Sequence, residues 1–181
     1  MVYTERAMPY EDTMFLKMSV DVLSFFDPEQ LRRITPDIER NTYKKGDIVI
    51  FKGQITDGFY IIKKGSVLVV MKPKPGQSEP VTVPLATGDF FGEMSLLTGS
   101  PRSAHVTALC DTTALELDKL ALGPILQANP SLAKRLGDIV LHRQLANDAT
   151  LRAMPPAERR TAQRSQAAEL LANIRAFFAL D

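Results

Sequence analysis

Short apolar runs separated by glycines fill the middle of the chain and limit the folds open to it. Between residues 42 and 117 the runs are rich in Val, Ile, Phe and Tyr, and each is too short for a typical helix. The glycines that separate them are Gly46, Gly53, Gly58, Gly65, Gly88 and Gly92. We expect strands near 42–45, 48–52, 58–63, 66–72, 80–86, 104–110 and 112–117. Many short strands with regular turns indicate a sandwich or barrel, so the sequence predicts a small antiparallel β-roll.

Two connections within this region carry their own signals. Residues 63–66 read Lys-Lys-Gly-Ser, which predicts a tight hairpin because Gly65 can adopt a positive φ at little cost. Residues 72–80 contain three prolines and Gly76, which predicts a looser loop between two strands.

Helical patterns flank the β-rich region on both sides. Residues 1–40 are expected to be helical and amphipathic, with apolar side chains at three- and four-residue spacings: Met14, Phe15, Met18, Val22, Phe25 and Phe26. Within that segment Asp27, Pro28 and Glu29 predict the start of a short helix, because they suit the cap, the first position and the positive end of the helix dipole.

The helical pattern returns at Leu120 and runs to the end of the chain. A short helix is expected at 120–127, and Asn129-Pro130 interrupts it. Ser131 is the expected cap of a longer helix with an apolar side made of Leu132, Leu136, Ile139, Val140 and Leu145. Pro155-Pro156 ends that helix, and a last helix carries an apolar stripe of Leu170, Leu171, Ile174, Phe177 and Phe178.

Composition excludes several classes of protein. The net charge is +1 and the basic residues are spread along the chain, which gives no reason to expect nucleic-acid binding. No segment approaches the roughly 18 consecutive apolar residues that span a membrane, so we expect a cytoplasmic protein without direct membrane insertion. The single cysteine, Cys110, rules out an internal disulfide and is expected to be a buried small side chain.

The sequence also argues against catalysis. It has no nucleophile elbow, no paired metal-ligand motif and no Walker-type loop. Its two histidines, His105 and His142, lack a second ligand candidate at a suitable spacing, so we expect exposed or strand-face histidines and no metal site. We therefore expect a protein that is not an enzyme and needs no cofactor.

Residues 90–104 differ from the rest of the β-rich region, because their second half is too polar for a strand. Residues 93–97 have the composition of one helical turn, which Gly92 would start and Gly99 would stop. The first turn of a helix has unpaired backbone N–H groups that favour an anion, and a residue without a Cβ lets the anion approach the backbone. The planar guanidinium of Arg102 adds a positive charge and a fork of donors suited to phosphate oxygens.

Glu93 is compatible with a phosphate site only if its carboxylate binds another part of the ligand. A carboxylate beside a phosphate would be repelled, but it can accept a hydrogen bond from a sugar hydroxyl. An anion site next to an acceptor for a sugar hydroxyl predicts a nucleotide pocket. With one arginine, no lysine and no acidic metal ligands there, the phosphate is expected to carry a single charge.

This segment resembles the phosphate-binding cassette of the cyclic-nucleotide-binding domain family, in the channel-type and catabolite-activator-type domains of bacteria among others. The family pattern is roughly Phe-Gly-Glu-aliphatic-small-Leu, a short loop, then Pro-Arg-small-Ala. The matching residues here are Phe91, Gly92, Glu93, Met94, Ser95 and Leu96, then Pro101, Arg102, Ser103 and Ala104. Further family-like residues are Lys45-Gly46-Asp47, Gly53, Asp57-Gly58-Phe59-Tyr60 and Lys64-Gly65-Ser66-Val67. His105 departs from the pattern, since threonine is common there.

The resemblance implies a fold and a division of the chain. The fold would be mainly β, an eight-stranded antiparallel roll of the jelly-roll or double-stranded β-helix kind with N-terminal helices and C-terminal lid helices. The segments would be an N-terminal helical part at 1–40, the β-roll at 41–119 with the cassette at 91–104, the hinge and lid helices at 120–150, and a C-terminal amphipathic helix at 151–181.

The resemblance also implies the ligand contacts. Glu93 would bind the ribose 2′-hydroxyl and Arg102 the cyclic phosphate, and Arg143 on the lid helix would stack on the purine. The candidate ligand-binding residues are Gly92, Glu93, Met94, Ser95, Arg102, Ser103, Ala104 and Arg143.

We therefore expect a regulatory module that binds cAMP, or less favourably cGMP, and converts binding into movement of the lid helices. It would be a single-cassette signalling protein or the cytoplasmic part of a channel or transporter. Its terminal helices would contact a protein partner, a fused effector domain or a second copy in a homodimer.

Two alternatives stay open. One is a degenerate β-roll that mediates protein–protein interaction without nucleotide. The other, less favoured, is a transcription regulator of the catabolite-activator type that lacks its DNA-binding domain. Ser103 lies where threonine accompanies cGMP preference and alanine cAMP preference, so it does not decide between the nucleotides.

Overall fold

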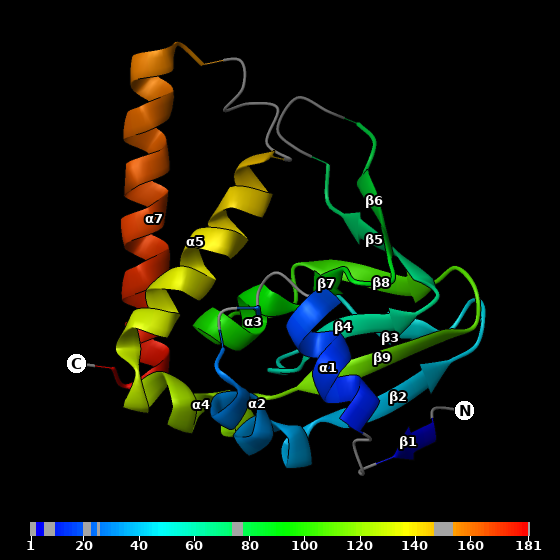
Figure 1. The fold of residues 1–181 in the computed structure, drawn as a ribbon. Coiled ribbons are helices and arrows are strands. Elements are labelled where there is room, and N and C mark those ends of the chain that lie inside the picture. Colours follow the sequence, from blue (N-terminus) through cyan, green and yellow to red (C-terminus); the bar gives the residue numbers. More distant parts are fainter. Residues whose placement is uncertain are drawn as a thin grey trace. The chain divides into compact units, whose positions relative to one another are not determined.

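The computed structural model describes residues 3–5, 10–19, 23–24, 26–73, 78–146 and 154–180. The chain forms two compact units, Met1–Leu122 and Gly123–Asp181. The first contains the β-rich region with the helices that precede it, and the second consists of helices (Figure 1).

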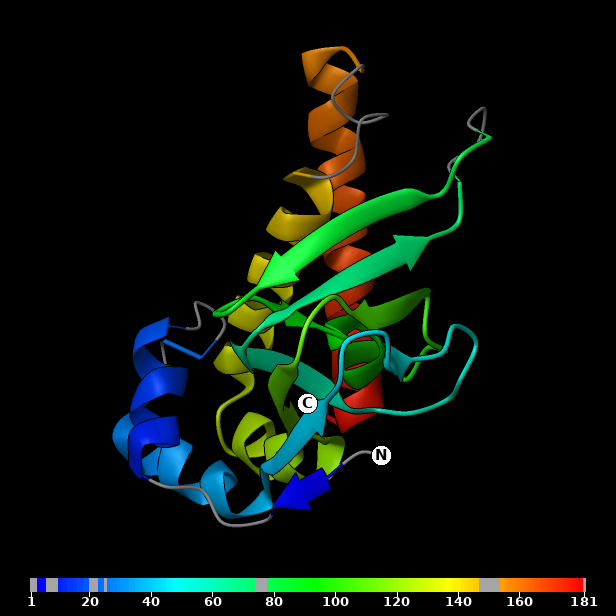
Figure 2. The ribbon, with the colours of Figure 1, turned by 90° about the vertical axis from the view of Figure 1, so that its right-hand side faces the viewer.

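Two antiparallel sheets form the centre of the first unit. The five-stranded sheet has the order β1-β2-β9-β4-β7, and the four-stranded sheet has the order β3-β8-β5-β6. The strands are β1 (Tyr3–Glu5), β2 (Glu39–Tyr43), β3 (Ile48–Ile50), β4 (Phe59–Lys64), β5 (Ser66–Met71), β6 (Val81–Ala86), β7 (Phe90–Phe91), β8 (Ala104–Ala108) and β9 (Thr112–Leu117). The predicted mainly β fold is confirmed, and β2 to β9 supply the expected eight strands. Figure 2 shows the long β5–β6 hairpin from the side.

Tyr3–Glu5 differs from the sequence-based expectation of a wholly helical 1–40 segment. This strand pairs with β2, with Tyr3 opposite Thr42 and Glu5 opposite Arg40. Three residues give too little periodic pattern to predict a strand, and the partner lies almost forty positions away. Strand β7 was missed for the same reason, since it has only two residues and is defined by its pairing with β4.

The turn at Gly65 is not the predicted hairpin. Strand β4 pairs with β9 and β7 in one sheet, whereas β5 pairs with β8 and β6 in the other. Gly65 therefore turns the chain from one sheet into the other, with a φ of 97°. A Cβ at Gly65 would lie 2.7 Å from the carbonyl oxygen of Asp111 and 2.8 Å from Cα of Thr112, so the corner requires glycine.

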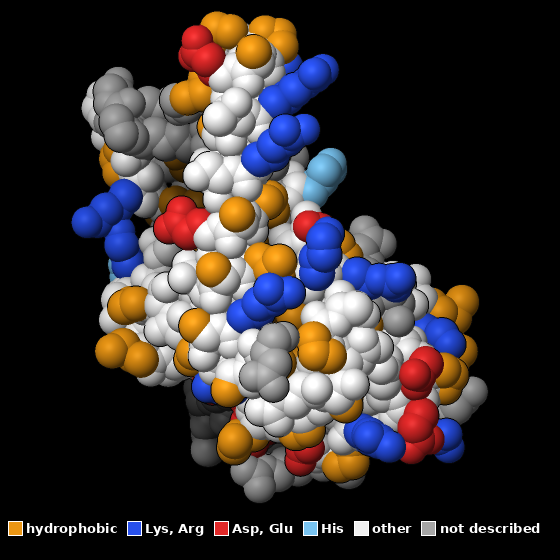
Figure 3. All heavy atoms as spheres, turned by 90° about the vertical axis from the view of Figure 1, so that its left-hand side faces the viewer, with side chains coloured by type: hydrophobic (Ala, Val, Ile, Leu, Met, Phe, Trp, Pro, Cys, Tyr) orange, Lys and Arg blue, Asp and Glu red, His pale blue; other side chains and the backbone are white. Residues whose placement is uncertain are grey.

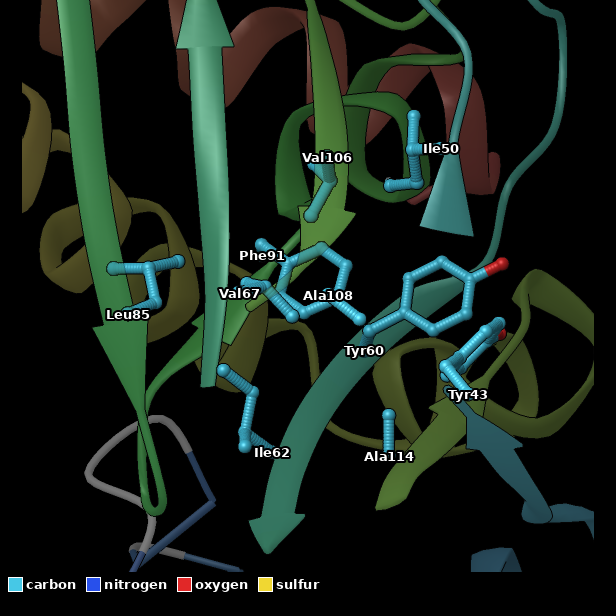
Figure 4. Close-up of a cluster of buried hydrophobic side chains, with 10 residues drawn as sticks. All are labelled: Tyr43, Ile50, Tyr60, Ile62, Val67, Leu85, Phe91, Val106, Ala108 and Ala114. Atoms are coloured by element: carbon cyan, nitrogen blue, oxygen red, sulfur yellow. The ribbon is translucent and has the colours of Figure 1, made fainter. Parts of the chain in front are cut away.

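An apolar core lies between the two sheets (Figure 4). It contains Tyr43, Ile50, Tyr60, Ile62, Val67, Leu85, Phe91, Val106, Ala108 and Ala114. All four residues from Phe59 to Ile62 in β4 are buried. A strand whose two faces are both covered reads as a continuous apolar run, which explains why this segment lacks the alternation of a half-buried strand.

The helices before the β-rich region follow the sequence in part. Helices α1 (Tyr10–Ser19) and α2 (Pro28–Ile34) are present, and a 3₁₀ turn (Thr35–Asp37) follows. Asp27 caps α2 as predicted: the N–H of Gln30 donates to Oδ1 of Asp27 over 2.8 Å, and the N–H of Asp27 donates to the Gln30 side chain over 2.9 Å. These reciprocal bonds form a capping box.

The predicted apolar stripe of the N-terminal segment is only partly right. Met18 is 77% exposed, while Leu16, which lies between the predicted positions, is fully buried. Phe26 is buried as expected. Val22 and Phe25 lie outside the described residues. The predicted loop at 72–80 joins β5 to β6, and its residues 74–77 are also outside them.

Cys110 is exposed rather than buried, so that prediction was wrong. It lies in the turn between β8 and β9, where its Sγ is 3.4 Å from Oγ of Ser66. The pKa of the Cys110 thiol is lowered, chiefly by this contact with the Ser66 side chain. His105 and His142 are exposed, as expected.

Helices α5 (Pro130–Ala146) and α7 (Pro156–Phe178) pack against each other in the second unit. The predicted stripe of α7 is confirmed at Leu170, Ile174 and Phe178, which are buried. Gly137 in α5 faces Ile174, and the Gln127 side chain of α4 (Lys119–Ala128) donates to the carbonyl oxygen of Phe178 over 3.2 Å. The stripe is thus covered within its own unit.

Helix α5 begins at Pro130, so Ser131 lies in its first turn and is not the cap. Its predicted apolar side is confirmed at Leu132, Leu136 and Val140, and the side chain of Leu145 is outside the described residues.

The solvent side of α7 carries basic side chains. Arg160, Arg164 and Arg175 are exposed, and Figure 3 shows basic, apolar and acidic side chains together on the face that it draws. Within the described part of the chain, no helix is long and apolar enough to cross a membrane.

Candidate functional site

Helix α3 (Glu93–Thr98) is the single helical turn expected between two glycines. Gly92 precedes it with a φ of 81° and Gly99 follows it with a φ of 70°, both in the left-handed region. The N–H of Gly99 donates to the carbonyl oxygen of Ser95 over 2.9 Å, which closes the last turn. Residues without a Cβ adopt this conformation at little cost, so the two glycines set where α3 starts and stops.

Gly92 also allows a close approach by Arg102. A Cβ at position 92 would lie 2.6 Å from Nη1 of Arg102 and 2.9 Å from the carbonyl oxygen of Gly58. Both distances are shorter than normal contacts, and the second atom belongs to the backbone. Gly92 is therefore required by space as well as by its φ.

Arg102 is 3% exposed, and its guanidinium makes three hydrogen bonds with protein acceptors. Nε donates to Oγ1 of Thr56 over 2.9 Å. Nη1 donates to the carbonyl oxygen of Gly92 over 2.9 Å, and Nη2 donates to that of Gly58 over 2.6 Å. A buried cation needs such partners, because an unpaired charge would cost several kcal/mol.

The backbone of Arg102 is bound to the loop between β3 and β4. Its N–H donates to the carbonyl oxygen of Gln54 over 2.8 Å, and its carbonyl accepts from the N–H of Gly53 over 2.9 Å. The same loop continues to Thr56 and Gly58, which bind the side chain. Residues 53–58 therefore hold both ends of Arg102.

Tyr60 lies beneath the guanidinium. The Cζ of Arg102 is 5.6 Å from the centre of the Tyr60 ring, within the range of a cation–π contact. The Tyr60 ring in turn stacks on Phe91, with 5.1 Å between ring centres and 10° between planes. Strand β7 thus supports the aromatic ring that supports the arginine.

A partly buried carboxylate completes this polar cluster. Glu116 in β9 accepts a hydrogen bond from Nδ2 of Asn41 over 2.7 Å, and it also bonds with the hydroxyl of Tyr60. Burial raises the pKa of Glu116, and the hydrogen bond from Tyr60 opposes this shift. Burial likewise raises the pKa of the Tyr60 hydroxyl, and the charge of Glu116 raises it further.

Burial also lowers the pKa of Arg102, while nearby groups stabilise its charged form. The largest of these opposing effects come from Tyr60 and Glu116, followed by Asp57 and Glu93. Glu93 is thus close enough for its charge to act on Arg102, although the two residues lie at opposite ends of the cassette. The Arg102 cation is therefore surrounded by carbonyl groups and carboxylates that stabilise its charge.

The predicted site residues differ in their contacts and in their exposure to solvent. Gly92 and Arg102 are in direct contact, and Ser95 and Ala104 are buried near them in sequence. Gly92, Glu93 and Met94 are partly exposed, and Ser103 is exposed. Arg143 belongs to α5 in the second unit, and its side chain is outside the described residues.

Thr56, Gly58, Tyr60 and Glu116 were not predicted as part of this cluster. Three of them lie in or beside the Asp57–Tyr60 segment, which the sequence marks only as family-like. The hydrogen bonds of Thr56 and Gly58 with Arg102 span 46 and 44 residues, so no local pattern reveals them. The described residues contain no group of three or more His, Cys, Asp and Glu side chains suited to hold a metal ion.

The chain is similar to known proteins over the region that contains this site. Residues 40–129 match the family described as the cyclic nucleotide-binding domain. The chain is 33% identical over 102 residues to a cAMP-dependent protein kinase regulatory subunit of Dictyostelium discoideum, an alignment that covers 55% of this chain and 31% of that protein. It is 35% identical over 107 residues to a cGMP-dependent protein kinase of Drosophila melanogaster, covering 59% of this chain and 11% of that protein. It therefore spans less than a third of the length of these relatives.

Among solved structures, the regulatory domain of Toxoplasma gondii PKA with cAMP aligns with a TM-score of 0.61 and 26% identity. The alignment covers 71% of this chain and 48% of that chain. The residues matched by the family include strands β3 to β9, most of β2, the turn α3, and Arg102 with its partners at positions 56, 58, 60 and 92. This chain belongs to the cyclic nucleotide-binding domain family, and residues 40–129 form its family domain.

Proposed function

We propose that the chain is a regulatory module that binds a cyclic nucleotide at the cassette formed by residues 91–104. The observation that carries the proposal is the buried Arg102 guanidinium in contact with Gly92, directly before α3. Of the five N–H groups of an arginine, three donate to acceptors among the described residues, which leaves two for phosphate oxygens. A cyclic phosphodiester carries one negative charge, which matches a single cation.

Glu93 at the first position of α3 is the proposed acceptor for the ribose hydroxyl. Backbone N–H groups of the first turn, with Met94 and Ser95, and those of Ser103 and Ala104 are proposed to complete the contacts. Each of these residues lies within the cassette, and α3 runs from Glu93 to Thr98, one residue beyond the predicted turn. The proposed role is binding and signalling rather than catalysis.

We propose cAMP as the preferred ligand over cGMP. Several relatives of the chain are named for cAMP, others are named for cGMP, and the exposed Ser103 favours neither. The preference rests further on the stacking role proposed for Arg143, because stacking does not require the amino group of guanine.

The proposed output is movement of the helices that follow β9. Binding would reposition α4 and α5 so that Arg143 covers the purine, and the terminal helices would pass the change to a protein partner, a fused effector domain or a second copy. A partner that prefers the ligand-bound form must also tighten nucleotide binding. Hydrogen exchange tests this: residues 120–146 should exchange more slowly with nucleotide, and equal exchange would contradict the proposal.

Calorimetric titration of cAMP and cGMP tests the binding itself. The protein is first unfolded and refolded to remove any bound nucleotide. Micromolar or tighter binding of either nucleotide is the expected result, and Arg102→Lys should weaken it because lysine lacks the planar fork. Absence of binding in folded protein would contradict the proposal.

One observation favours the alternative of a β-roll that mediates protein interaction without nucleotide. The three protein acceptors of Arg102 are sufficient to keep a buried arginine as a structural group. The same titration separates the two functions, because the alternative predicts that neither nucleotide binds.

A further inference from the structure

Thr56 supplies one of the three acceptors that fix the Arg102 guanidinium, and it is the side-chain acceptor among them. The other two are backbone carbonyls, at Gly58 beside the start of β4 and at Gly92 beside the start of α3. Their positions are set by the sheet and by the left-handed turn. Thr56 lies instead in an exposed part of the β3–β4 loop.

The three acceptors bind different nitrogens of the planar guanidinium and together fix its orientation. Bonds to Nη1 and Nη2 hold the end of the guanidinium, and the bond to Nε holds the side nearest the aliphatic stem. A rigid plane held at three nitrogens has one orientation, whereas a plane held at its two terminal nitrogens can tilt about the line that joins them. Without the hydroxyl, Nε would also be an unsatisfied donor on a residue that is 3% exposed.

The loop that contains Thr56 is itself hydrogen-bonded to the backbone of Arg102. Gly53 and Gln54 make two backbone hydrogen bonds with Arg102, at 2.9 and 2.8 Å, and they lie shortly before Thr56 in the chain. The hydroxyl is therefore placed by contacts with the same residue whose side chain it holds.

We propose that Thr56 is a positioning residue for ligand binding: its hydroxyl fixes the Arg102 guanidinium so that the two remaining N–H groups, one on each Nη, meet the cyclic phosphate. This inference rests on the proposed function and adds to it a residue outside the cassette. Thr56 does not touch the nucleotide, and it acts through Arg102.

Thr56→Val tests the inference, since valine keeps the branched shape and removes the acceptor. The expected result is about a tenfold weaker affinity for cAMP, equivalent to about 1.4 kcal/mol. Thr56→Ser keeps a hydroxyl and should bind within about twofold of wild type. Thr82→Val, at an exposed threonine of β6, is the matched control and should bind as wild type.

A double-mutant cycle separates positioning from a general effect on folding. Lysine has no Nε, so Thr56→Val should cause no further loss in an Arg102→Lys background. Equal losses in the two backgrounds, or a Thr56→Val variant that binds like wild type, would overturn the inference.

The exchange rate of the Arg102 Nε–H, measured by NMR without ligand, distinguishes this inference from the proposed function. The proton should exchange faster in Thr56→Val than in wild type whether or not nucleotide binds. An unchanged rate would overturn the inference even if wild type binds cAMP. Faster exchange in a protein that binds neither nucleotide would show the Thr56–Arg102 bond and overturn its role in ligand binding together with the proposed function.

Discussion

Replacing Gly92 with alanine tests the central contact of the site, and the structure supplies its matched control. Alanine at a φ of 81° is in the left-handed region, which costs about 1–2 kcal/mol. Its Cβ would lie 2.6 Å from Nη1 of Arg102 and 2.9 Å from the carbonyl oxygen of Gly58. The arginine must move, and the loss of a hydrogen bond from a charged group adds about 1.5–3 kcal/mol.

The expected loss for Gly92→Ala is therefore about 2.5–5 kcal/mol in the free energy of unfolding. That is a large share of the roughly 5–15 kcal/mol that stabilises a typical domain. Gly46 has a φ of 90°, and a Cβ there would meet nothing within 4 Å. Gly46→Ala therefore reports the backbone strain alone, with an expected loss of about 1–2 kcal/mol.

Urea unfolding measures both variants, with the slope of the transition compared to confirm that only stability has changed. The difference between the two variants gives the part due to crowding of Arg102 and Gly58. Equal losses at Gly92 and Gly46 would refute the reasoning, because the close approach would then cost nothing. Nucleotide affinity of Gly92→Ala, measured where the variant is still folded, should fall as well.

Three further changes address other parts of the molecule. Burial raises the pKa of Glu116 above its ordinary 4.5, so the contribution of this residue to stability is greatest below that pH and is lost as the pH rises through the raised pKa. Glu116→Gln should therefore gain stability relative to wild type as the pH rises above 4.5, and a difference that stays constant with pH would contradict this. Asp27→Ala removes the side-chain acceptor of the capping box and should cost about 1 kcal/mol in urea unfolding, whereas Asp27→Asn should cost much less. Ile174→Ala removes a fully buried side chain in the second unit and should lower the free energy of unfolding by about 2–5 kcal/mol. Ala172→Ser, at an exposed position of the same helix, should leave it nearly unchanged. Equal losses in the two variants would argue against the packing of α7 on α5.

The sequence by itself determined the features that depend on neighbouring residues. The helix start at Asp27 was predicted from Asp27, Pro28 and Glu29, and the turn α3 was predicted from Gly92 and Gly99 on either side of a short helical segment. Each of the seven predicted strand positions holds a strand, because a run of β-branched and aromatic residues between turn residues is a local signal. The cassette motif was readable for the same reason, since its members lie within about fifteen residues.

Only the tertiary structure decided how these pieces meet. Gly65 marked a turn, but whether β4 and β5 pair or separate into two sheets depends on the strands that lie beside them. Tyr3–Glu5 is a strand because its backbone pairs with that of β2 at the edge of the sheet.

The acceptors of Arg102 illustrate the same limit at the site. Thr56 and Gly58 lie 46 and 44 residues away and reach the guanidinium because the two sheets bring the β3–β4 loop against the end of the cassette. Hydrogen bonds over such separations depend on the packing of the whole domain, and no local pattern of residues encodes them.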